Sequence, residues 1–359
     1  MSKWIKHHAG TVAFAAGGLL VAAAMVIWAT GGFGAILPRY NTAQATKKTT
    51  VAMGSVVSQT VYGKTEEGQQ AATAANAAIA QLEQKISWRI ESSAVAKVNA
   101  AAGISGAECD AATLQLIAQC LDVAQKSDGA FDPCILPVSR LWDFDAESFS
   151  PPADSAVQQG LAVCSWQQLS VKDKTVSLAQ SGAGIDLGGV GKGAACDEAL
   201  KIYAQRGVSG AVVAVGGSVG VFGAKPDGSA WSIGVRDPEG GETDSLGTLT
   251  VTSGCVSTSG TYEKKREFDG TIYHHILDPR TGYPAKSELV SATVICDSGA
   301  LSDALATACV VLGREKAEKL LAQYSAAYLL IDQNHVIYSG GGAEKLFALS
   351  SAKYTLQTP

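Results

Sequence analysis

"GAVVAVGGSVGVFG", residues 210–223, is the stretch on which the fold class depends. It is short, rich in valine and broken in the middle by Gly216 and Gly217, which is typical of β-structure interrupted by a glycine turn. The runs "WSIGVRDP" (231–238) and "GTLTVTSGCVSTSG" (247–260) have the same character. These runs follow one another without the strand–helix alternation that a doubly wound sheet requires.

Helical patterns lie on either side of this β-rich region. Residues 68–88 and 108–127 carry apolar side chains at helical spacing, and "SDALATACVVLG" (302–313) and the run 314–324 return to helix. Two further segments, 165–180 and 326–339, are predicted to be hairpins. Because helices and strands are segregated along the chain, the sequence predicts an α+β fold.

Composition narrows the class of protein. The chain has 359 residues, 47% of them hydrophobic, so it can bury a sizeable core. Its net charge of -5, with basic residues scattered, argues against nucleic-acid binding, which needs clustered Lys and Arg. The eight cysteines stand singly without a C-x-x-C pair. We expect them to behave as small buried hydrophobes, although one or two bridges stay open if the domain is exported.

The N-terminus predicts a membrane anchor. Residues 12–30 are apolar and uncharged, long enough to span a bilayer, and lysines precede them. We therefore expect a cytoplasmic N-terminus (1–11), a single transmembrane anchor (12–30), a linker (31–50) and an extracytoplasmic domain (51–359). A cleaved signal peptide is the alternative, because "AQA" at 43–45 has a small-residue cleavage pattern.

A glycine-rich segment, "GIDLGGVGKGAACDEAL" (184–200), is the first candidate site. Glycines that lead into a helix can cradle phosphate with backbone N–H groups. The spacing fits neither the dinucleotide-binding nor the P-loop fingerprint, and a purely structural turn is the alternative. Asp186 and Lys192 favour an anionic ligand with a polar headgroup.

Asp303 and Thr307 form the second candidate. They stand four residues apart, hence on one helix face, with Ser302 as the expected cap. A carboxylate and a hydroxyl are hard oxygen ligands that suit Mg²⁺. The alternative is an acidic residue that merely complements the helix dipole.

Two loops complete the set. In "SDGAFDPCILPV" (127–138), Asp132 precedes a proline and could present its carboxylate to a ligand, or simply connect a helix to a strand. In "HHILDPRTGYP" (274–284), a tight turn follows two of the chain's five histidines. A histidine there could act as a general base or a phosphate donor, or could only pack and hydrogen-bond within a strand.

Seven blocks in order resemble the ApbE family, the FAD:protein FMN transferases. They are "MGS" (53–55), "GAFDP" (129–133), "IDLGGVGKG" (185–193), "VGGSVGVFG" (215–223), "TSGTYEKK" (258–265), "YHHILDPRTGYP" (273–284) and "SDALATACVVLG" (302–313). The resemblance implies an ApbE-like, T-fold-like single catalytic domain of mixed sheets and helices, which transfers the FMN half of FAD to a Ser or Thr hydroxyl of a partner flavoprotein and releases AMP.

The resemblance also implies site residues. Mg²⁺ would be held by the Gly189 carbonyl with Asp303 and Thr307, Asp303 also acting in catalysis, and His275 is the expected base. The residues expected to bind the flavin nucleotide are Met53, Arg89, Ala130, Phe131, Asp132, Asp186, Lys192 and Ile276. The acceptor is expected to be a separate protein, such as a subunit of a membrane redox complex.

Three positions depart from the family pattern: Ser218 and Thr261 replace aspartates, and Arg89 stands where an aromatic ring often lies near the flavin. Two other functions stay open. Water as the nucleophile would make the protein an FAD pyrophosphatase, and loss of chemistry would leave a membrane-tethered flavin-binding module.

Overall fold

The computed structural model describes residues 44–358. The expected cytoplasmic N-terminus (1–11) and anchor (12–30) lie outside these residues. Among the helices of residues 44–358, none has the length and hydrophobicity needed to cross a bilayer.

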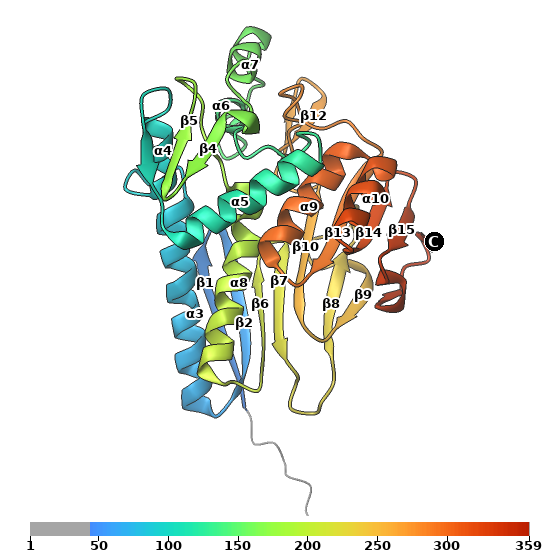
Figure 1. The fold of residues 1–359 in the computed structure, drawn as a ribbon. Coiled ribbons are helices and arrows are strands. Elements are labelled where there is room, and N and C mark those ends of the chain that lie inside the picture. The colour runs from blue at the N-terminus through green and yellow to red at the C-terminus, as the bar shows by residue number, and fades with distance from the viewer. Residues whose placement is uncertain (1–43, 359) are drawn as a thin grey trace, which may run out of the picture. The chain divides into compact units, whose positions relative to one another are not determined.

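A nine-stranded sheet forms the centre of the domain (Figure 1). Its strands pair antiparallel except for the parallel pair at the C-terminal edge, β15 with β17. In spatial order the strands are β1 (Gln44–Ala52), β2 (Ser55–Gly63), β6 (Gly210–Val215), β7 (Ser218–Gly223), β10 (Gly254–Gly260), β13 (Leu289–Cys296), β14 (Ala327–Asp332), β15 (Val336–Gly340) and β17 (Thr355–Gln357).

The predicted α+β class is confirmed by this sheet. Residues 210–223 form the hairpin β6–β7, in which Val215 pairs with Ser218 around the two glycines. Gly216 has a φ of 55°, a backbone conformation that glycine adopts without steric cost. The strands expected in 165–180 and 326–339 also form as hairpins.

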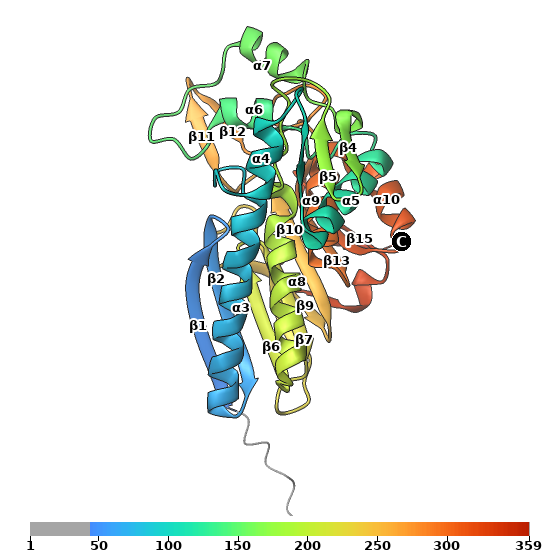
Figure 2. The same ribbon diagram turned by 60° about the vertical axis from the view of Figure 1, so that its left-hand side comes forward.

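Helices cover one face of the sheet. The long helices α3 (Thr65–Ile86) and α8 (Gly188–Arg206) run side by side over the first strands, and α9 (Gly299–Leu312) lies beside α8 (Figures 1 and 2). Small buried residues of α3, such as Ala71, Ala72 and Ala75, allow the close approach of α8. The remaining helices over this region are α5 (Ala111–Lys126) and α10 (Arg314–Gln323).

A second core lies on the opposite face. There β8 (Trp231–Arg236), β9 (Ser245–Val251) and β16 (Phe347–Leu349) form a three-stranded sheet. Buried Leu246 and Leu249 of this sheet pack with Leu329 and Ile331 of β14. The central sheet is therefore buried on both faces along this part of its width.

Smaller elements lie beyond one end of the sheet (Figure 2). A third core joins two of them through Trp142, which is 1% exposed and packs against Tyr273 and Tyr283. These elements are α4 (Ala94–Ala100), α6 (Leu136–Trp142), α7 (Asp154–Leu161), the sheet of β3 (Gly106–Glu108), β5 (Thr175–Leu178) and β4 (Leu169–Lys172), and the hairpin of β11 (Lys265–Phe268) and β12 (Thr271–His274).

The expected boundary between linker and domain is wrong by several residues. The structure begins the domain with β1 at Gln44, so the last part of the 31–50 segment is strand. This strand alternates between exposed and half-buried residues because it is the sheet edge, with one face toward α3. Its Thr and Lys side chains therefore gave no apolar pattern.

Candidate active site

A cleft of about 1100 Å³ opens at one end of the central sheet. The β1–β2 turn, the β6–β7 turn and the end of β10 all reach this end, because the intervening strands are antiparallel. The structure places every expected site residue along the cleft except Asp303, which lies behind its wall. The expected residues that line it are Met53, Arg89, Ala130, Phe131, Asp132, Asp186, Gly189, Lys192, His275, Ile276 and Thr307.

Met53 is positioned by the tight turn between β1 and β2. Met53 and Gly54 have φ angles of 57° and 62°, as in the two-residue turns that match the twist of paired strands. A positive φ is unfavourable for methionine. The Met53 N–H donates to Glu83 Oε1 of α3 at 3.0 Å, which holds the turn against the cleft.

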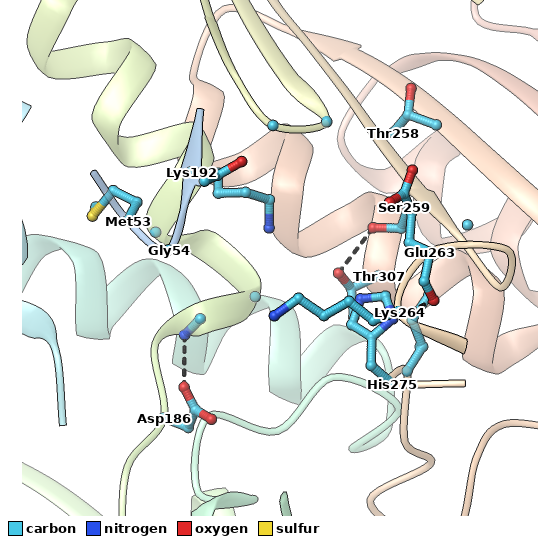
Figure 3. A pocket seen from close by; sticks show the side chains of 18 of the residues that line it. Met53, Gly54, Asp186, Lys192, Thr258, Ser259, Glu263, Lys264, His275 and Thr307 are labelled. Carbon is cyan, nitrogen blue, oxygen red and sulfur yellow. Dashed lines mark hydrogen bonds between the residues drawn. The ribbon is translucent and has the colours of Figure 1, made fainter. Parts of the chain in front are cut away.

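The glycine-rich segment forms the first turns of α8 itself and is not a lead-in that precedes the helix, as expected from the sequence. The helix begins at Gly188, whose N–H donates to Asp186 Oδ1 at 2.8 Å (Figure 3). Asp186 also accepts from the Ser139 hydroxyl at 3.2 Å. An added Cβ on Gly189 would lie 3.0 Å from the Phe131 ring, so a close contact of ring and backbone shapes this wall. The free N–H groups of such a helix start favour an anion.

The starts of α8 and α9 cross with their backbones nearly touching. An added Cβ on Gly193 would lie 1.9 Å from the Gly299 oxygen, and one on Gly299 would lie 2.2 Å from the Gly193 oxygen. Only glycine fits at either position. This crossing brings Asp303 of α9 to the Gly193 N–H, which donates to Asp303 Oδ2 at 3.0 Å.

Asp303 is a buried carboxylate, 2% exposed. Lys192 Nζ lies 4.0 Å from Asp303 Oδ1, which is longer than a hydrogen bond. Burial raises the pKa of Asp303, although Lys192 and the Gly193 N–H lower it. A carboxylate in this setting would be stabilised by a further cation.

Thr307 stands one turn from Asp303 and shares its helix face. Its hydroxyl donates to the Asp303 carbonyl at 3.1 Å and lies 3.1 Å from the Ser259 hydroxyl (Figure 3). The α9 cap is Ser298, not the expected Ser302, which is buried inside the helix. Ser298 accepts from Leu301 N.

The oxygens of Asp303, Thr307 and Gly189 are the ligand type that Mg²⁺ prefers. Residues 44–358 hold no cluster of three or more His, Cys, Asp or Glu side chains suited to a metal. A metal held by these three residues would rely on one carboxylate together with hydroxyl, carbonyl and ligand oxygens. This donor set fits Mg²⁺ bound jointly with substrate phosphates better than Zn²⁺.

Asp132 lines the cleft but its carboxylate is committed to the backbone. Its two oxygens accept from Cys134 N at 2.7 Å and Trp166 N at 3.0 Å. The neighbouring Pro133 carbonyl accepts from Asp186 N at 2.7 Å. Asp132 therefore fixes the loop that carries Phe131 against α8, and this geometry favours a positioning role over direct contact with a ligand.

The two histidines have different surroundings. His275 Nδ1 lies 3.2 Å from the Glu263 carbonyl oxygen. Because a carbonyl only accepts, Nδ1 carries the proton and Nε2 of the neutral ring has the free lone pair. Burial, helped by the positive charge of Lys192, lowers the pKa of His275 to about 4. The ring is therefore neutral at pH 7, as a general base must be.

The His274 ring lies against the backbone and does not line the cleft. Its Nε2 lies 3.1 Å from the Ala285 carbonyl, and it is not among the lining residues. The following turn is tight as predicted: Asp278 Oδ1 accepts from Arg280 N at 2.9 Å, and Gly282 has a φ of 78°. Trp142 Nε1 donates to the Gly282 carbonyl at 2.8 Å, which anchors the turn to α6.

Arg89 lies at the rim beside an aromatic residue that the sequence reasoning missed. Its guanidinium lies 4.3 Å from the ring centre of Trp88, which also lines the cleft. An aromatic side chain is therefore present on this wall, at position 88 instead of position 89. Trp88 could have been predicted from the sequence as a lining residue because it closely follows the helix end at Ile86.

Other residues that line the cleft were not predicted from the sequence. Glu263 and Lys264 belong to the "TSGTYEKK" run, and their position after a glycine-broken strand was a usable signal. Asp145 lies in the loop after α6 and had no such signal. The departures at Ser218 and Thr261 are local: Ser218 is buried against Ser257, and Thr261 bonds Val290.

The cysteine expectation agrees with the structure. All eight thiols are free, and six of them are buried. The six buried thiols pack among apolar residues of the main core, as Cys120 and Cys309 do.

Known proteins are similar to this chain in sequence and in fold. The ApbE family model matches residues 53–330. A protein of Treponema pallidum named FAD:protein FMN transferase is 32% identical over 295 residues, covering 77% of this chain and 81% of the relative. The Escherichia coli K12 relative of the same name is 29% identical, covering 69% and 73%.

Solved structures of similar proteins have the same fold. The ApbE protein of Thermotoga maritima superposes with a TM-score of 0.77 and 31% identity, covering 84% of this chain and 99% of that one. The flavin transferase ApbE of Vibrio cholerae has the same TM-score at 22% identity, covering 85% and 99%, and therefore shares the fold. The fold, the ordered motifs and the cleft define a flavin transferase-type enzyme. The chain belongs to the ApbE family.

Proposed function

We propose that this protein transfers the FMN moiety of FAD to a Ser or Thr hydroxyl of a partner flavoprotein, depends on Mg²⁺ and releases AMP. The observation that carries this proposal is the position of His275 in the same cleft as the α8 start, with its Nδ1 held by the Glu263 carbonyl and its Nε2 left to accept a proton. A base can take the proton of the acceptor hydroxyl, and an anion-favouring helix start can stabilise phosphate charge, and both serve transfer to a hydroxyl. The relatives' name, FAD:protein FMN transferase, supports the same reaction.

The cleft walls suit the parts of FAD. Phe131, Trp88 and Ile276 offer apolar surface to the flavin ring, and the α8 start with Lys192 offers positive potential to the pyrophosphate. Figure 3 shows that the Lys192 ammonium points into the pocket. Asp303 and Thr307, with the Gly189 carbonyl, would hold Mg²⁺, which would offset charge on the pyrophosphate oxygens.

The residues then have defined roles. The acceptor hydroxyl oxygen attacks the flavin-side phosphorus, its proton passes to His275 Nε2, and a new phosphoester bond joins FMN to the acceptor. The bond from that phosphorus to the bridging oxygen breaks, and AMP leaves with the electron pair. Lys192 stabilises the negative charge that gathers on the departing phosphate.

Two other outcomes share the same cleft. Water in place of the acceptor hydroxyl would give FMN and AMP, and an inert site would return FAD unchanged. The test is to incubate the full-length protein with FAD and Mg²⁺, with and without a flavoprotein subunit of a membrane redox complex. Transfer predicts an acceptor heavier by one FMN and AMP formed only with acceptor. Equal FAD consumption without acceptor, and no covalent flavin, would show hydrolysis instead.

We also propose that the protein is a single-pass membrane protein with its catalytic domain on the extracytoplasmic side. The uncharged run from Ala9 to Pro38, preceded by Lys3 and Lys6, supports this proposal. Labelling of single introduced cysteines with a membrane-impermeant reagent in intact cells tests it. Labelling of the domain only after lysis would contradict it.

A further inference from the structure

A single carboxylate at the cleft rim joins three loops. Asp145, in the loop after α6, accepts a hydrogen bond at Oδ1 from Lys264 Nζ at 2.8 Å. Its Oδ2 lies 3.6 Å from the Arg89 guanidinium in the segment after α3. Lys264 belongs to the loop between β10 and β11. Lys264 lowers the pKa of Asp145, so the carboxylate is charged at neutral pH.

The Lys264 loop needs such a restraint. Lys264 has a φ of 40°, in the left-handed region that is unfavourable for a residue with a Cβ. Conformations of this kind cost about 1–3 kcal/mol and persist only where surrounding contacts hold them. In Figure 3 the Lys264 side chain extends across the pocket, away from His275. Asp145 is the acceptor that fixes its far end.

The residue before Lys264 is the one that holds the base. The Glu263 carbonyl accepts from His275 Nδ1, and the Glu263 side chain pairs with Arg236 of β8. Side-chain pairs therefore hold both residues of the peptide group that contains the Glu263 carbonyl, Glu263 through Arg236 and Lys264 through Asp145. Its direction decides which nitrogen of His275 keeps the free lone pair.

We propose that Asp145 is a positioning residue for the base: by holding Lys264 it fixes the Glu263 carbonyl and thereby keeps His275 in the Nδ1–H tautomer. Only the expected effect of Asp145 on the rate rests on the proposed transfer reaction. Its structural part concerns the His275 ring and can be measured without turnover. Asp145 does not have to touch FAD or acceptor.

The kinetic test compares Asp145→Asn, Lys264→Met and the double variant in the full-length protein. We expect each single change to lower kcat on the order of 10-fold, as loss of an orienting partner does, with KM for FAD nearly unchanged. The double variant should be no slower than either single one, because both act through one pair. Asp145→Glu, which keeps the charge, should recover most of the activity. Glu198→Gln, which breaks the Lys201 ion pair on α8 outside the cleft, is the control.

The second measurement is the ¹⁵N spectrum of histidine-labelled protein, with the His275 signals assigned by His275→Gln. The wild type should give the Nδ1–H tautomer, and Asp145→Asn a mixture of both tautomers. A normal kcat in Asp145→Asn, or an unchanged tautomer, would overturn the inference. If no covalent flavin forms even in the wild type, the proposed function fails, whereas the tautomer measurement still decides the role of Asp145.

Discussion

His275 shows how the backbone can prepare a side chain for chemistry. The Glu263 carbonyl selects the tautomer, and burial together with Lys192 keeps the ring neutral. Both effects act before any ligand binds. They favour His275 over His274, whose Nε2 lies against the Ala285 carbonyl.

His275→Ala should lower kcat for FMN transfer by about 10²–10⁴-fold, the usual contribution of a positioned base. FAD affinity should change little, because the ring is expected to act on the acceptor proton. Quench-flow assays of covalent flavin, with FAD binding followed by fluorescence, measure the two quantities. Normal transfer by His275→Ala would return both histidines to a packing role.

The pH dependence of kcat follows from the lowered pKa of His275. Protonation removes the base, and the pKa of His275 in the folded protein is about 4, below the ordinary value of 6.5. We therefore expect kcat to hold as pH falls through 6.5 and to decline only near 4. A pH–rate profile with a midpoint at 6.5 or above would show that the ring is more exposed to solvent than in this structure.

Asp303 should be needed for the proposed metal dependence. Asp303→Asn keeps the size of the side chain but removes the charge, so we expect loss of Mg²⁺-dependent turnover of at least about 100-fold. The variant should remain folded, which circular dichroism can check. Full activity in Asp303→Asn would refute the proposed metal site, because Asp303 is the only charged group among its proposed ligands.

The crossing of α8 and α9 is the element-level feature that builds the site. It brings Lys192 of α8 within 4.0 Å of Asp303 of α9, and it exists because Gly193 and Gly299 present bare backbone to each other. Asp197 strengthens it, accepting from Gly299 N at 2.6 Å and Ala300 N at 3.0 Å at the start of α9.

Gly193→Ala should therefore destabilise the protein strongly. The new methyl would meet the Gly299 carbonyl, and we expect the free energy of unfolding to fall by about 2–3 kcal/mol or more. The matched change Gly191→Ala, whose added Cβ has its nearest neighbours at 3.7 Å, should be neutral or slightly stabilising. Urea unfolding of both variants measures the difference. Equal stabilities would mean that the helices do not cross this closely.

Sequence patterns predicted the elements whose residues alternate or repeat clearly. The β6–β7 hairpin and α3 are examples, since each carries an apolar face over most of its length. β1 was missed because an edge strand with an exposed face needs no apolar alternation. The start of α8 was missed because glycine disfavours helix, and only the crossing with α9 explains it. The Asp145–Lys264 pair joins positions 119 residues apart, beyond any local pattern.

Across the whole domain, the site is assembled from segments that the antiparallel sheet brings to one end. The main core holds the helices on the sheet, and the third core around Trp142 holds the His275 turn in place. Ligand binding should therefore stabilise the whole fold. The likeness to the Thermotoga maritima structure over 84% of this chain agrees with a domain built as one unit.

Binding of FAD with Mg²⁺ should raise the melting temperature of the full-length protein. At a ligand concentration 100-fold above Kd the gain is about 2.7 kcal/mol, which corresponds to a shift of a few degrees for a domain of this size. Differential scanning fluorimetry with FAD alone, Mg²⁺ alone and both together measures it. Asp303→Asn should lose the part of this rise in melting temperature that requires Mg²⁺. The same shift with and without Mg²⁺ in the wild type would contradict joint binding.

The intact mass of an acceptor flavoprotein after incubation with the full-length protein, FAD and Mg²⁺ tests FMN transfer most directly. We expect a gain of one FMN on a Ser or Thr of the acceptor, with one AMP released for each FMN attached. An acceptor of unchanged mass, with FMN and AMP free in solution in equal amounts, would contradict it.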